Sequence, residues 1–116
     1  MKKLRAIRVT VGQKPEVVEI SGDLKSLQSE VGGLIALVSL DAEVDAFVND
    51  EGLLERLPFN RVLPTEYGKV PVVGNVIVVS HDDEGDTAGL TEAQVAKWLP
   101  VLADAPSNMI SAFGTA

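Results

Sequence analysis

The sequence predicts an α+β fold: a single domain with a mixed sheet of about five strands and two short helices packed mainly on one face. Short apolar segments recur between turn residues, and two amphipathic segments carry helix-capping residues. A length of 116 residues suits one domain. We place that domain at residues 1–104 and expect a weakly structured tail over 105–116. Hairpins joined through a crossover helix favour the mixed sheet.

The first element is a predicted β-hairpin. Residues 4–11 alternate between apolar and polar side chains, which is typical of a half-buried strand. Residues 12–15 form a Gly-Gln-Lys-Pro turn, and residues 16–20 form the second strand.

A short helix follows. The stretch Ser21-Gly22-Asp23 offers oxygens that can cap its N-terminus, and Leu24, Leu27 and Val31 have helical spacing. The Gly32-Gly33 pair should end it, because glycine adopts the left-handed conformation that closes helices.

The middle of the chain holds the strongest apolar runs. Leu34–Leu40 is apolar on both faces, which indicates a central strand covered on both sides or a strand at a subunit contact. Val44–Asn49 should be the next strand. Pro58 to Lys69 reads as a long irregular connection, a type that is often functional. Val70–Ser80 predicts a further strand, with a bulge or close backbone approach at its glycine.

The last predicted element is a helix that begins at Thr91. Thr91 and Gln94 have the spacing of a capping box. Pro100 predicts a kink or a stop near Leu99, because proline disfavours helical geometry in the residue before it.

Composition and charge exclude several classes of function. The chain has no cysteine, which excludes disulfides and thiolate chemistry. Its net charge of -7 disfavours binding to nucleic acid and to acidic membranes. No apolar run approaches the roughly 20 residues needed to span a bilayer. We therefore expect a cytoplasmic protein that binds neither nucleic acid nor membrane.

The segment 49–61 is the best candidate for a functional site. Its turn residues separate apolar ones, and it ends in an Asn-Arg pair. The candidate binding residues are Asn49, Glu51, Asn60 and Arg61. Arg61 could recognise an anion or a partner through its planar fork. Alternatively, it pairs with a carboxylate such as Glu51 or Glu55 and fixes the irregular segment; we favour this structural interpretation.

No catalytic, cofactor or metal site is predicted. The acidic run 82–86 could in principle bind a divalent cation, but it lacks EF-hand spacing and reads more simply as a solvated loop. His81 is the only histidine; it could act as a general base oriented by Asp82 or Asp83, but a surface residue is the simpler interpretation.

The order of these elements resembles domain-of-unknown-function family 3846, small proteins from bacteria, phages and mobile elements. The resemblance spans roughly Ile7 to Leu99 and implies genomic context more than chemistry. It rests on a double glycine before an apolar strand, an acidic turn, Leu-Pro running into Asn-Arg, a valine-rich strand and a capped helix: Gly32–Ile35, Asn49–Gly52, Leu57–Arg61, Val73–Val79 and Leu90–Thr91.

The sequence thus favours a small non-catalytic cytosolic interaction protein from a bacterial or mobile-element genome. We expect a protein partner. A homodimer is also expected, because a single layer of helices would leave one sheet face uncovered. Two alternatives stay open. One is an acidic inhibitor that mimics nucleic acid and blocks a DNA-binding defence enzyme. The other is a small-ligand binder or an enzyme centred on Asn60 and Arg61.

Overall fold

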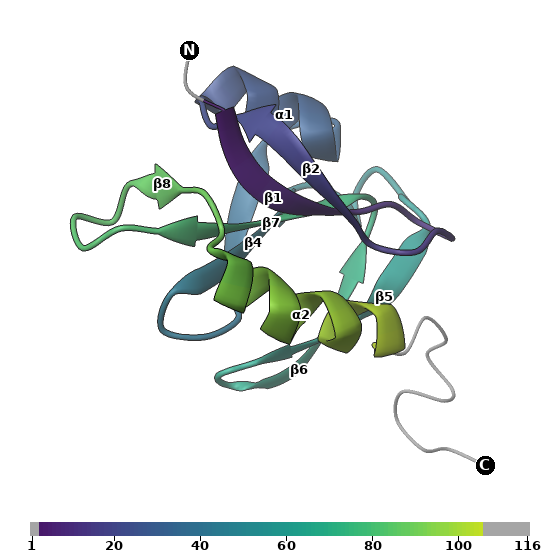
Figure 1. The fold of residues 1–116 in the computed structure, drawn as a ribbon. Coiled ribbons are helices and arrows are strands. Elements are labelled where there is room, and N and C mark those ends of the chain that lie inside the picture. The colour runs from purple at the N-terminus through teal and green to yellow at the C-terminus, as the bar shows by residue number, and fades with distance from the viewer. Residues whose placement is uncertain (1–2, 106–116) are drawn as a thin grey trace.

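The computed structural model describes residues 3–105 as one α+β domain, as predicted, and most of its regular structure is sheet (Figure 1). The expected tail over 105–116 lies outside the described residues except for its first position. The elements in chain order are β1 (Lys3–Val9), β2 (Glu16–Ser21), α1 (Leu24–Val31), β3 (Ile35–Ser39), β4 (Val44–Asn49), β5 (Phe59–Thr65), β6 (Gly68–Val73), β7 (Val76–His81), β8 (Thr87–Ala88) and α2 (Glu92–Asp104).

The main sheet has the strand order β2-β1-β7-β4-β3, and β8 adds to the end of β7. Each of these pairs is antiparallel, so the predicted mixed sheet is wrong. The reason is the route of the chain: α1 leads from β2 at one edge to β3 at the other. Its crossover therefore does not place two parallel strands side by side.

The two helices lie on opposite faces of the sheet, not mainly on one face as predicted (Figure 1). β7 is central and apolar on both sides. Its Ile77 and Val79 pack with α1, whereas Val76 and Val78 pack in the cluster that contains α2. A strand buried on both faces needs cover on both, and the sequence pattern alone does not say which element covers which face.

The segment predicted to be irregular is a β-hairpin. β5 and β6 pair as a separate two-stranded sheet, which lies with α2 in the core on one face. In the sequence, Pro58, Pro64 and Pro71 had argued against regular strands in this segment. Pro64 and Pro71 are tolerated because each strand of a two-stranded sheet has a free edge. Gly74, at φ 74°, separates β6 from β7, so the apolar run 70–80 forms two strands instead of one.

β3 is an edge strand, so the prediction that Leu34–Leu40 is a central strand is wrong. Both faces of the sheet have cover, because α1 packs on one face and α2 and the β5–β6 hairpin pack on the other. The reason for expecting a homodimer therefore no longer applies to the faces of the sheet. What remains open is the edge of β3, where Leu37 is 56% exposed.

Both helices begin as predicted. The Asp23 carboxylate accepts a hydrogen bond from the Ser26 amide at 2.7 Å, and Gly32 ends α1 in the left-handed region. Thr91 and Gln94 form a complete capping box at the start of α2. The helix then continues through Pro100 to Asp104, so the alternative of a stop near Leu99 is wrong.

Candidate functional site

Asn60 and Arg61, at the start of β5, are among the most buried polar residues of the domain, with 1% and 4% exposure. The pairing of β5 with β6 is interrupted by a β-bulge between Phe59 and Arg61, and Asn60 lies at this bulge. The bulge changes the direction of the side chains, so that two successive polar residues both point into the protein.

The Asn60 amide joins two segments that are far apart in the chain. Its Nδ2 donates to the Val9 carbonyl at 2.9 Å and to the Gly74 carbonyl at 2.8 Å. Its Oδ1 accepts from Arg61 Nε at 2.9 Å. Each polar atom of the side chain is therefore used, and Asn60 fixes the end of β1, the β6–β7 turn and β5 to one another.

Arg61 binds the C-terminal end of α2. Its Nη1 donates to the Leu102 carbonyl at 2.6 Å, and its Nη2 donates to the Gln13 carbonyl at 3.0 Å. Carbonyls in the last turn of a helix lack intrahelical partners and carry partial negative charge, so a guanidinium stabilises this end. Burial lowers the pKa of Arg61, which stays protonated at neutral pH.

Arg61 has the favoured structural contacts, but the expected carboxylate partner is wrong. No ion pair joins it to an acidic side chain within residues 3–105, and its partners are carbonyl oxygens and Asn60. The sequence suggested a recognition site because asparagine and arginine are common in such sites. The inward position of Arg61 depends on the Gln13 and Leu102 carbonyls, which are too distant in the sequence to be predicted from the residues around it.

Asn49 and Glu51 belong to a different cluster, at the end of β4. Asn49 Nδ2 donates to the Val31 carbonyl at 3.2 Å and to Glu55 Oε1 at 3.1 Å. Its Oδ1 accepts from the Glu51 amide at 2.8 Å. Asn49 thus supports the last carbonyl of α1 and shapes the following turn. Of the four predicted binding residues, Glu51 alone has an exposed side chain.

An apolar groove of about 590 Å³ opens beside this turn, between the β3–β4 edge and the β5–β6 hairpin. Concave, mostly apolar sites of this volume are typical of ligand and peptide binding. Leu53 and Leu54 stand at the groove with 81% and 82% exposure. Sequence reasoning missed these leucines as site residues, although two adjacent leucines in an acidic turn were a usable signal. The lining is Ala36, Val38, Val48, Asn49, Asp50, Glu51, Gly52, Leu53, Leu54, Phe59 and Val70–Val73.

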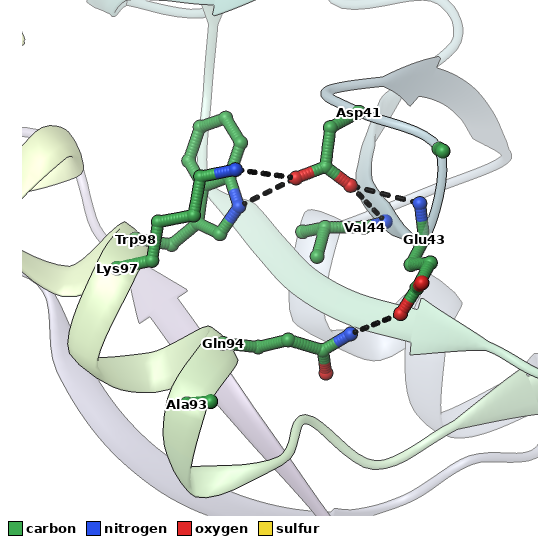
Figure 2. Close-up of a pocket in the computed structure, with 8 residues that line it drawn as sticks. Asp41, Glu43, Val44, Ala93, Gln94, Lys97 and Trp98 are labelled. Carbon is green, nitrogen blue, oxygen red and sulfur yellow. Dashed lines mark hydrogen bonds and ion pairs between the residues drawn. The ribbon is translucent and has the colours of Figure 1, made fainter.

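A more polar pocket of about 390 Å³ lies between the β3–β4 turn and α2 (Figure 2). The Asp41 carboxylate accepts from Trp98 Nε1 at 3.0 Å and Lys97 Nζ at 3.3 Å. It also accepts from the Glu43 and Val44 amides. Burial opposes ionisation of Asp41, but these hydrogen bonds together hold its pKa below the usual value. The carboxylate is occupied in fastening α2 to the turn, which is a structural task.

The sequence indicates that His81 is a surface residue, with a general base oriented by Asp82 or Asp83 as the alternative. The structure gives it another partner: its Nδ1 lies 2.7 Å from Oδ2 of the buried Asp45. The hydrogen bond to Asp45 raises the pKa of His81. A carboxylate that orients an imidazole is one part of a general base. The neighbouring Ser80 hydroxyl does not complete a nucleophilic pair, because it donates to the Glu43 carbonyl at 2.8 Å.

The acidic run 82–86 forms the turn between β7 and β8. Asp82 Oδ1 accepts from the Glu84 and Asp86 amides, both at 2.9 Å, and Gly85 supplies the left-handed position. Over residues 3–105, no three histidine or acidic side chains gather in a way that could hold a metal ion. Among the same residues, no helix is both long and apolar enough to cross a bilayer.

The fold and its contacts define a small antiparallel α+β domain with buried polar anchors and an open apolar groove. The chain belongs to the family described as Domain of unknown function (DUF3846), whose profile matches residues 1–102. The family predicted from the order of motifs is therefore confirmed. The search of curated proteins gave no match, and neither did the search of solved structures.

Proposed function

We propose that this chain is a small, non-catalytic interaction protein of the bacterial cytosol, from a bacterial or mobile-element genome, that binds a protein partner through its apolar groove. The observation that carries the proposal is the pair of adjacent leucines, Leu53 and Leu54, at a groove of about 590 Å³. Scattered single apolar residues are normal on surfaces, but a contiguous apolar patch with a polar rim is typical of an interaction site.

The polar contacts support this proposal over a site at Asn60 and Arg61. Their side-chain nitrogens and the Asn60 oxygen bind partners inside the domain. A ligand at Arg61 would have to displace the Leu102 or Gln13 carbonyl. Several acids that a nucleic-acid mimic would need to display also have internal partners: Asp23, Glu30, Asp41, Asp45 and Asp82.

The test is affinity capture from the native host with the wild-type chain and with a Leu53→Ser, Leu54→Ser double variant. The variant should fold normally, because both side chains are exposed. We expect one protein to be retained in stoichiometric amount by the wild type and lost by the variant. A Val17→Ser variant serves as a matched control, since it removes an exposed apolar side chain on the opposite edge of the sheet. Retention of the same proteins by all three chains would contradict the proposal.

A further inference from the structure

The two edges of the main sheet are built differently. β2 carries Glu16 and Glu19, and charges on an edge strand discourage pairing with another chain. β3, with the sequence Ile-Ala-Leu-Val-Ser, contains no charged residue and no proline. One edge is therefore protected against strand addition and the other is not.

The hydrogen-bonding groups of β3 that face outward can be assigned from its register with β4. The Asp50 amide donates to the Leu34 carbonyl, and the Leu40 amide donates to the Val44 carbonyl. Even-numbered residues of β3 thus bond to β4, because bonded and non-bonded pairs alternate in antiparallel strands. The amides and carbonyls of Ile35, Leu37 and Ser39 point away from β4, and among the described strands β4 is the one that pairs with β3.

The apolar groove lies along the same edge. Ala36 and Val38 of β3 form part of its lining, so a strand added beside β3 would direct alternate side chains toward the groove. Main-chain bonds to an open edge supply affinity in this type of recognition, and side-chain pockets supply specificity.

The charges around the groove indicate what this strand should carry. The residues that line it include Asp50 and Glu51 but no lysine or arginine. No ion pair involves either carboxylate within residues 3–105. Asp50 lies directly across from Leu34, so the uncompensated negative charge is at the N-terminal end of β3.

The same charges disfavour a second copy of this chain as the occupant. Antiparallel pairing of two β3 strands about Leu37 would bring the Asp50–Glu51 end of one copy toward the Asp41–Glu43 turn of the other. Acidic groups would then face acidic groups between two chains that each carry a net charge of -7. Like charges across an interface oppose association.

We infer that the edge of β3 binds an extended apolar segment of another protein, which adds as a strand and carries lysine or arginine at the end beside Asp50 and Glu51. The inference rests on the proposed function and names the class of partner. The partner side chains that enter the groove are apolar, at every second position.

The probe is a display library of random peptides, selected on the purified chain and counter-selected on a Leu37→Lys variant. That variant places a charge on the exposed edge and leaves the bonds to β4 intact. We expect the enriched peptides to alternate apolar residues and to carry a basic residue at one end. Bound peptide should protect the amides of Ile35, Leu37 and Ser39 from hydrogen exchange.

Matched variants then distinguish the contribution of the β3 edge to binding from that of the Asp50 and Glu51 carboxylates. Leu37→Lys should weaken the selected peptides at least about tenfold, and Val17→Lys on β2 should change affinity less than about twofold. Joint Asp50→Lys and Glu51→Lys should weaken basic peptides about tenfold and remove their salt dependence. Joint Asp83→Lys and Glu84→Lys, at exposed positions in the β7–β8 turn, is the control for the same change in overall charge.

Several results would overturn the inference. These are no enrichment over the Leu37→Lys variant, enriched peptides without basic ends, or binding that leaves the three amides unprotected. A dimeric mass with those amides already protected in the free protein would assign the edge to a second copy. If host capture still depends on Leu53 and Leu54 while the edge tests fail, the proposed function stands without strand addition. If the edge tests succeed but capture fails, the proposed function is the part that is wrong.

Discussion

Two residue pairs in the segment 49–61 have opposite environments. Leu53 and Leu54 are more than four-fifths exposed and stand at an open groove. Asn60 and Arg61 are buried and hydrogen-bonded to four other parts of the chain. In these two pairs the apolar residues lie outside and the polar residues lie inside, which reverses the usual distribution. Such a reversal separates the two tasks: the buried polar pair holds the fold, and the exposed apolar pair is available for binding.

Replacing Arg61 should have the largest effect on stability. Arg61→Ala removes a charged donor from the Leu102 and Gln13 carbonyls and should lower the free energy of unfolding by about 3 kcal/mol. Arg61→Lys should recover part of the loss, because an ammonium cannot reproduce the planar fork. Denaturant melts measure both values. An unchanged melt for Arg61→Ala would break the comparison by showing that Arg61 is free to bind a ligand.

Asn60→Ala should have the next largest effect. It leaves the buried Val9 and Gly74 carbonyls without the amide that joins them, a cost of about 2 kcal/mol. Hydrogen exchange should then accelerate in the β6–β7 turn and at the end of β1. If the loss instead spread evenly over the domain, Asn60 would not be a local link between these segments.

The pair formed by His81 and Asp45 should contribute a smaller, pH-dependent effect, because His81 is partly exposed and its charge is screened. Its pKa is raised above the ordinary value of 6.5. The contribution is therefore full below about pH 6.5 and is lost as the pH rises through the folded-state pKa. Melts of the wild type and of His81→Gln from pH 5 to pH 9 should converge at the alkaline end. Parallel curves across this range would exclude the pair as the source.

The smallest effect on stability should come from the exposed leucines. Leu53→Ser and Leu54→Ser together should change the free energy of unfolding by no more than about 0.5 kcal/mol, as is usual for surface substitutions. A loss approaching that of Arg61→Ala would mean that the leucines belong to the core in solution. The contrast between the two residue pairs of the segment would then disappear.

Sequence reasoning singled out residues that make specific contacts inside the domain, but it left their roles undecided. It selected the segment 49–61 from its residue types, and Asn49, Asn60 and Arg61 all make specific contacts there. It could not separate an inward Arg61 from an outward one, because the deciding partners lie 41 and 48 positions away. It also assigned no role to Asp41 or Asp45, whose partners Trp98 and His81 lie 57 and 36 positions away.

The sequence by itself determined the α+β class, the family and the beginnings of both helices. Those features depend on residues within a few positions of one another: Asp23 with Ser26, Thr91 with Gln94, and Gly32 at the end of α1. Tertiary structure alone decided that α1 and α2 cover opposite faces, that β5 and β6 form a hairpin despite their prolines, and that β3 lies at an open edge. An apolar strand needs a neighbour and a cover, but its pattern does not state which segment supplies them. That choice follows from packing all the elements together, and it is what left the edge of β3 and the groove exposed.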